Sequence, residues 1–276
     1  MLKRFFSFFI LSIFSFVVSS LFIKYVKNMD PVMIYLKENK STFSYDAVNA
    51  TFDGVSMIPG KKGMIIDVDE SYSLMKKYGS FNDDLLVFKE IDPDISISNV
   101  YDKYISFGNL DKSEVSFIFK IDNNKYIKEI VSILKEKEII GTFFLNKEFI
   151  YDKDLVIYLY LNNQEIEYYD TDYDFNLLRY ASIFVSSYTS KSLSYCYNDI
   201  YDKSNITNCG LRRMHMIIPS ISCDKYPFYE VKNSLGNGSI IKFDSSKTVL
   251  YELRHIINYI RQKNYEIVSL KKMLEE

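Results

Sequence analysis

The stretch VSFIFKIDNNKYIKEIVSILKEKEIIGTFFL, residues 115–145, decides the fold. Its first seven residues are almost all apolar, which is typical of a strand buried on both faces of a parallel sheet. The polar step at 122–124 can cap a helix, and apolar residues then recur on one helix face up to about residue 137. Residues 141–145 predict the next strand. Strand, helix and strand within about 30 residues form a βαβ unit, which implies parallel strands and a right-handed crossover.

The same pattern recurs at the carboxyl end, where a strand at 239–243 precedes a helix at 247–263 and a strand at 265–270. Between the two units the sequence predicts further elements in alternation: helices at 152–162 and 176–191, and strands at 165–169, 195–197 and 214–221. Alternation of this kind predicts a (β/α) barrel or an open α/β sheet.

The region that precedes residue 113 is less regular. Residues 24–44 are mixed and rich in lysine, which indicates a stalk. From residue 46 onward, short apolar runs are broken by turn signals such as Pro59-Gly60. Helical spacing at 67–78 and an apolar run at 85–88 predict one helix and one strand. We therefore expect a small α+β region here, without a chemical motif.

The amino end predicts a membrane segment. Residues 5–23 carry no charge and have only serine as a polar interruption. Nineteen helical residues span roughly 28 Å, which is enough to cross the hydrocarbon layer. Basic residues lie on both sides, at 3–4 and at 24 and 27. We predict an uncleaved single-pass anchor with the amino terminus inside and the rest of the chain outside the cytoplasm. Cleavage as a signal peptide near Ser19-Ser20 is the alternative.

Composition excludes several classes of protein. Of 276 residues, 47% are hydrophobic and 25% charged, which excludes wholesale disorder. The net charge of -2 gives no support for a nucleic-acid partner. Only two histidines, His215 and His255, are present, and both are expected to be structural. Cys196 and Cys209 could form a disulfide outside the cell, although free buried thiols are an equal alternative.

Two stretches of the second half resemble the NodB-type polysaccharide deacetylase domain, carbohydrate esterase family 4. Residues 115–145 are similar to the family's opening strand, helix and strand, and residues 238–276 to its closing strand and helix. The resemblance implies a distorted (β/α) barrel, preceded here by the small α+β region and the transmembrane helix. The expected domains are 1–28 (anchor), 29–112 (stalk and small region) and 113–276 (deacetylase-like). The family hydrolyses acetamides of cell-wall glycans with a metal-activated water.

The residues that carry family chemistry are replaced in this sequence. The family's general base falls on Lys120, and its first metal ligand falls on Ile121. The two histidine ligands, for which the segment 162–174 is the match, fall on Tyr169 and Tyr173, and the histidine acid falls on Phe243. A neutral tyrosine is a poor ligand for a divalent metal, because its pKa is about 10. The sequence therefore predicts a catalytically inactive domain that holds no cofactor.

Tyrosines gather where the predicted strands end, which is the rim where barrels place their sites. These glycan-binding candidates are Tyr168, Tyr169, Tyr173, Tyr195 and Tyr197. Aromatic rings pack on the C–H faces of sugars, and phenols supply hydrogen bonds. The predicted function is a membrane-anchored deacetylase-like protein that binds or scaffolds at cell-wall glycan. The competing interpretation is that tyrosines merely fill a vacated metal pocket.

A weaker alternative keeps hydrolytic activity. Asp170, Asp172 and Asp174 alternate as in the start of a calcium loop, although Phe175 and Ala181 stand where that loop needs glycine and glutamate. If these carboxylates held zinc or another divalent cation, the chain would be an active, divergent glycan N-deacetylase. A solvated acidic loop is the simpler interpretation. A third, noncatalytic hypothesis makes 46–112 the working part, contacting a membrane or wall partner.

Overall fold

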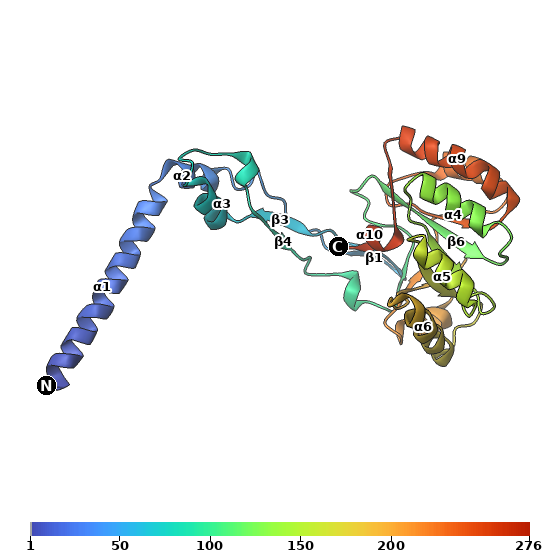
Figure 1. The fold of residues 1–276 in the computed structure, drawn as a ribbon, viewed down its shortest axis with the longest axis horizontal. Coiled ribbons are helices and arrows are strands. Elements are labelled where there is room, and N and C mark those ends of the chain that lie inside the picture. Colours follow the sequence, from blue (N-terminus) through green and yellow to red (C-terminus); the bar gives the residue numbers. More distant parts are fainter. Residues whose placement is uncertain (1) are drawn as a thin grey trace. The chain divides into compact units, whose positions relative to one another are not determined.

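The computed structural model describes residues 2–276, and side chains from residue 11 onward. The chain divides into two compact units (Figure 1). The smaller unit comprises the chain up to Val48 together with Lys62–Asp92, and the larger comprises Asn49–Lys61 and Pro93–Glu276. Two segments that the sequence assigns to the upstream region, 49–61 and 93–112, thus lie in the same unit as 113–276.

The smaller unit combines helices with one antiparallel strand pair. Its elements are α1 (Leu2–Asn28), α2 (Pro31–Glu38), β3 (Gly63–Ile66), α3 (Val68–Met75), η1 (Asp83–Leu85) and β4 (Phe88–Ile91). The α2 helix begins where the Asp30 carboxylate accepts a hydrogen bond from the Val32 N–H, with Pro31 in the first turn. The predicted helix at 67–78 is confirmed as α3, whereas the predicted strand at 85–88 begins only at Phe88.

The α1 helix contains a segment, Leu11–Asn28, that is long and apolar enough to cross a membrane. None of its described side chains is buried against protein, and large apolar ones such as Phe14, Phe16 and Leu21 are mostly exposed. An apolar helix without protein around it needs a lipid environment or removal. This finding fits either an anchor or a signal sequence.

The larger unit contains a mainly parallel sheet. Its strands are β1 (Thr51–Asp53), β2 (Ser56–Ile58), β5 (Tyr104–Ile105), β6 (Glu114–Ile121), β7 (Thr142–Leu145), β8 (Glu165–Tyr169), β9 (Tyr195–Tyr197), β10 (His215–Ile217), β11 (Ile221–Cys223), β12 (Ile240–Asp244) and β13 (Glu266–Val268). The order is β1-β2-β5-β10-β9-β8-β7-β6-β12-β11, and β13 pairs with β6. Among the described strand pairs of this sheet, β1–β2 is antiparallel and the others are parallel. The predicted distorted (β/α) barrel is confirmed.

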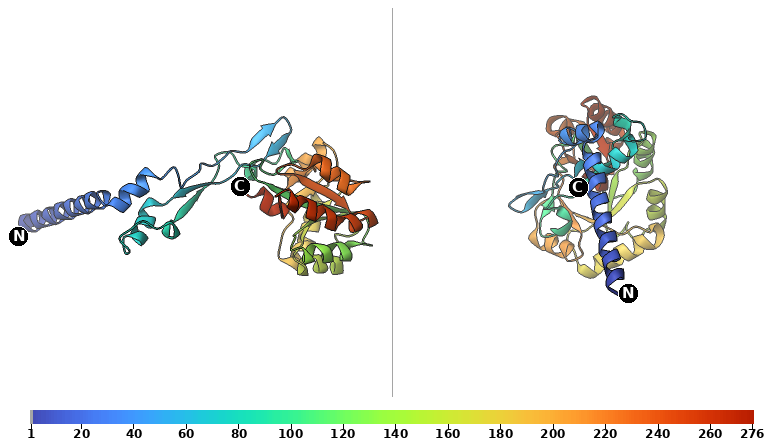
Figure 2. Two further views of the ribbon diagram at one scale, coloured as in Figure 1. Left: turned by 90° about the horizontal axis from the view of Figure 1, so that it is seen from above. Right: turned by 90° about the vertical axis from the view of Figure 1, so that its left-hand side faces the viewer.

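Helices cover the outer face of this curled sheet (Figures 1 and 2). They are α4 (Ile127–Glu136), α5 (Lys153–Leu161), α6 (Phe175–Thr189), α7 (Lys203–Gly210), α8 (Pro227–Ser234) and α9 (Lys247–Gln262). The short helix α10 (Leu270–Leu274) and the turn η2 (Ile97–Asn99) instead contribute side chains to a separate core. Side chains alternate along β6, so that Phe119 packs in the main core under the helices. Ile118 instead packs in a second core with residues of the inner face.

The predicted strand at 214–221 is wrong as a single element. It divides into β10 and β11, and Pro219 lies between them. Proline has no N–H to donate to a sheet, so it interrupts the pairing. The two pieces then join different parts of the sheet, because β10 lies between β5 and β9 whereas β11 pairs with β12.

Candidate functional site

The ends of β6 and β12 place two lysines on the inner face of the sheet. Lys120 on β6 and Asp244 on β12 are direct partners in the parallel register, and Lys242 lies two residues before Asp244. The spacing of two keeps Lys120 and Ile118 on one face, and likewise Lys242 and Asp244. Lysine is seldom buried without a partner, yet the Lys242 side chain is only 6% exposed.

Both ammonium groups are neutralised by carboxylates. Lys120 donates to Asp199 with an Nζ–Oδ2 distance of 2.9 Å. Lys242 donates to Asp224 and lies 3.9 Å from Asp199. The Tyr197 hydroxyl also donates to Asp199. Although partial burial raises the pKa of Asp199, the Tyr197 hydroxyl and the Lys120 ammonium outweigh it, so the pKa lies below its ordinary value.

Two cavities flank Lys120 and Asp122. One, of about 450 Å³, is lined by both lysines together with Asp122, Asp199, Ser222, Asp224 and Asp244. The other, of about 590 Å³, is lined by Lys120, Asp122, Asn146, Lys147, Glu148, Tyr169, Asp170 and Thr171. We call the two together the cleft. It lies at the carboxyl ends of the strands, where barrels and open parallel sheets bind ligands.

Two of the predicted tyrosines contact Lys120. Its Nζ lies 5.3 Å from the ring centre of Tyr169 and 5.7 Å from that of Tyr197, which is within the range of cation–π attraction. The Tyr169 hydroxyl donates to Asp122 and lies 3.3 Å from the carbonyl oxygen of Ile121. Burial and then the neighbouring carboxylate raise the pKa of Tyr169, so its phenol stays protonated.

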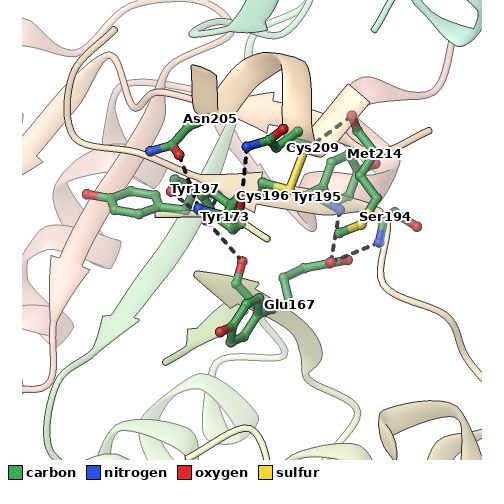
Figure 3. Close-up of a disulfide and its surroundings, with 11 residues drawn as sticks. Glu167, Tyr173, Ser194, Tyr195, Cys196, Tyr197, Asn205, Cys209 and Met214 are labelled. Atoms are coloured by element: carbon green, nitrogen blue, oxygen red, sulfur yellow. Dashed lines mark hydrogen bonds between the residues drawn. A yellow bond between two sulfur atoms is a disulfide. The ribbon is translucent and has the colours of Figure 1, made fainter. Parts of the chain in front are cut away.

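Tyr173 serves the backbone instead of the cleft (Figure 3). Its buried hydroxyl donates to the carbonyl oxygen of Tyr197 at 2.7 Å and accepts from the N–H of the same residue at 2.9 Å. Asn205 accepts a hydrogen bond from the Tyr173 N–H, and a disulfide joins Cys196 on β9 to Cys209 on α7. These contacts fix the end of β9, from which Tyr197 and Asp199 reach Lys120.

The other two tyrosines point elsewhere. Tyr168 packs in the core under the helices, and its hydroxyl donates to Asp170. Tyr195 lies at the beginning of β9, where the buried carboxylate of Glu167 accepts its N–H at 2.9 Å. Of the five predicted tyrosines, the structure therefore brings only Tyr169 and Tyr197 to Lys120.

Neither histidine lines the cleft. His215 stacks on Tyr101 with ring centres 4.7 Å apart, and burial lowers its pKa to about 4. The ring is therefore neutral at neutral pH. His255 is exposed on α9.

Comparison with known proteins identifies the fold. No family model matches the sequence. A segment of 118 residues, 42% of this chain, is 30% identical to the uncharacterized protein YlxY of Bacillus subtilis strain 168, and the match spans only 37% of that relative. The solved structure of BA3943, a family 4 carbohydrate esterase pseudoenzyme from Bacillus anthracis, superposes with a TM-score of 0.71 at 19% identity, covering 90% of this chain and 96% of that one.

The chain has the fold of the family 4 carbohydrate esterases. The structure of Bacillus subtilis PdaA, described as a family 4 carbohydrate esterase, superposes as well, with a TM-score of 0.55 and 15% identity over 83% of this chain and 97% of that one. The resemblance of residues 115–145 and 238–276 to the NodB-type deacetylases is thus confirmed for the fold.

The strand register turns two of the positions that the resemblance assigns, Phe243 and Ile121, away from the cleft. Phe243 is fully buried under the helices, with its ring 5.5 Å from that of Phe119, so it cannot face a ligand in the cleft. The two flanking residues, Lys242 and Asp244, line the cleft. Ile121 likewise packs in the core under the helices. Of the positions that carry family chemistry, Lys120 and Tyr169 lie together at the cleft.

The side chains present do not fit the divalent metal that the fold family implies. Lysine ammonium groups donate hydrogen bonds and offer no lone pair to a cation. Across residues 2–276 there is no group of three or more histidine, cysteine, aspartate or glutamate side chains that could hold a metal. Two carboxylates of the alternative triad are engaged in other hydrogen bonds. Asp170 accepts from the Tyr168 hydroxyl, and Asp174 caps α6.

Several charged residues of the cleft were not predicted from the sequence, among them Asp199, Asp224, Lys242 and Asp244. Three of these are aspartates at or just beyond the end of a strand. This position was the available signal, because the carboxyl ends of neighbouring parallel strands meet at one edge. Lys242 gave a further signal as a charge inside an otherwise apolar strand.

Proposed function

We propose that this chain is a deacetylase-like protein without hydrolytic activity, held at the membrane by α1, whose cleft binds cell-wall glycan. The observation that carries the proposal is the pairing of Lys120 with Asp199, because the family resemblance assigns Lys120 to the general-base position. A general base must accept a proton, and an ammonium group can only donate one. The fold shared with a pseudoenzyme from Bacillus anthracis supports this proposal.

Two further observations support the location. The apolar helix α1 suits a membrane span, and an anchor would keep the chain at the cell surface. The Cys196–Cys209 disulfide suits an oxidising environment outside the cytoplasm. Glycan binding is supported by the Tyr169 ring at the cleft and by the fold shared with PdaA, a carbohydrate esterase.

An acetate-release assay tests the absence of hydrolysis. The full chain in detergent is incubated with a fully N-acetylated glucosamine tetrasaccharide, with and without added zinc. We expect no acetate above the level of a heat-denatured sample, and less than one equivalent of zinc in the purified chain. Acetate release that depends on zinc and stops on chelation would instead establish the active, divergent N-deacetylase.

A further inference from the structure

The charges that line the cleft do not balance. Its lysines are Lys120, Lys147 and Lys242, and its carboxylates are Asp122, Glu148, Asp170, Asp199, Asp224 and Asp244. Three cations against six anions leave a surplus of three negative charges. A concave site with surplus charge of one sign concentrates ligands of the opposite sign.

The central lysines do not compensate the charge of Asp244. Lys120 pairs with Asp199 and Lys242 pairs with Asp224, so each lysine is neutralised by its own partner. Among the described residues, Oδ1 of Asp244 is buried and has no hydrogen-bond partner. A buried acceptor without a donor costs free energy. A positively charged ligand in the smaller cavity, which Asp244 lines, would compensate the charge of this carboxylate.

The surplus negative charge lies close to the aromatic ring of Tyr169. Asp244 is the register partner of Lys120, and Asp122 follows Lys120 by two residues and accepts from Tyr169. Tyr169 lines the larger cavity and is 6% exposed, so a small part of its side chain is open to a sugar in that cavity. The Tyr169 side chain and the surplus carboxylates together suit a sugar that bears an ammonium group.

We propose that the cleft binds a de-N-acetylated glycan, whose free amino groups are protonated, in preference to its N-acetylated form. This inference rests on the proposed function and specifies its ligand. An acetamide is neutral and gains nothing from the surplus charge. A glycan that carries carboxylates or phosphates would be repelled by the same field.

Isothermal titration calorimetry on the full chain in detergent, at about pH 6 and low salt, tests the preference. The probes are a glucosamine tetrasaccharide and its fully N-acetylated counterpart. We expect the amine form to bind at least about tenfold more tightly, because it gains one charge-assisted hydrogen bond in the cleft. Added salt should weaken the amine form only.

The variant Asp244→Asn removes one charge from the cleft and keeps the shape of the side chain. It should lower affinity for the amine tetrasaccharide about tenfold and leave that for the N-acetylated form unchanged. The matched control is Asp111→Asn, an exposed carboxylate that lines neither cavity and should bind like the native chain. Thermal unfolding of both variants shows whether they fold.

If Asp244→Asn does not fold, the salt dependence of the native chain decides in its place. Equal or tighter binding of the N-acetylated tetrasaccharide would overturn the inference and leave the proposed glycan binding in place, whereas no binding of either probe would overturn both. Acetate release from the N-acetylated probe would overturn the proposed function instead, so the two failures are distinguishable.

Discussion

At the scale of single residues, the Tyr173 hydroxyl makes two hydrogen bonds to the backbone of β9 that a neighbouring strand would otherwise make. It satisfies both the N–H and the carbonyl oxygen of Tyr197 at the end of β9. Buried backbone groups need such partners, because water cannot reach them. A tyrosine that the resemblance places at a metal-ligand position is therefore explained here by backbone hydrogen bonding.

The substitution Tyr173→Phe should lower the free energy of unfolding by about 1–3 kcal/mol, because it leaves a buried N–H without an acceptor. Urea unfolding of the detergent-solubilised chain measures this change. The control is Tyr180→Phe on α6, whose side chain is 56% exposed and should tolerate the change within about 0.5 kcal/mol. An equal effect in both variants would show that the Tyr173 hydroxyl carries no such role.

Matching the family's motifs letter by letter assigned Lys120, Ile121, Tyr169 and Phe243 to one site, and of these four the structure brings Lys120 and Tyr169 to the cleft. Lys120 and Tyr169 follow from matching β6 and β8 to the family's strands, and both face the cleft. Phe243 was assigned by matching motif letters, and a shift of one residue in a strand turns a side chain to the opposite face. Asp199 could not be assigned in this way, since its place depends on a loop held by contacts far apart in sequence.

At the scale of elements, the disulfide joins a central strand to a peripheral helix. Cys196 on β9 and Cys209 on α7 lie 13 residues apart in sequence, and both are fully buried. The segment between them contains Asp199, which pairs with Lys120. The crosslink therefore restrains the loop on which the ion pairs of the cleft depend.

Replacing both cysteines, Cys196→Ala with Cys209→Ala, should lower the free energy of unfolding by about 3 kcal/mol, as expected for a loop of this length. Urea unfolding with and without reductant measures the loss. The control is Cys223→Ala, which removes the buried free thiol without opening a loop.

Thiol counting checks the same bond directly. In the denatured, unreduced chain one cysteine, Cys223, should react with a maleimide, and after reduction all three should react. Three reactive thiols before reduction in chain isolated from its native compartment would contradict the disulfide.

Local patterns predicted most of the helices and parallel strands, because each βαβ unit is encoded within a short stretch. The strands β1, β2 and β5 were missed as parts of the sheet. They are two or three residues long. Of the three, β5 pairs with β10, which lies more than 100 residues later in the chain, and β2 pairs with β5. No local periodicity records such a pairing, and their small apolar content is shared with ordinary loops.

At the scale of the whole molecule, the central question is whether α1 is retained. In the orientation that we propose, a retained span keeps the cleft at the cell surface, whereas cleavage releases the chain. The apolar length suits both fates, and the basic residues on either side weaken the orientation signal. Our proposed location outside the cytoplasm, which the disulfide supports, is the same for a retained and for a cleaved α1.

We expect the native chain to stay in the membrane fraction after alkaline carbonate extraction, with its amino terminus intact by mass spectrometry. Substituting Phe14→Lys and Val18→Lys together places two charges in the apolar segment, each unfavourable by about 2.5–3.5 kcal/mol at the centre of a membrane helix. The double variant should lose membrane retention. The control Tyr25→Lys lies near the basic end of α1 and should be retained, because lysine at a helix end reaches the interface. Soluble native chain that begins near residue 21 would show instead that α1 is a cleaved signal.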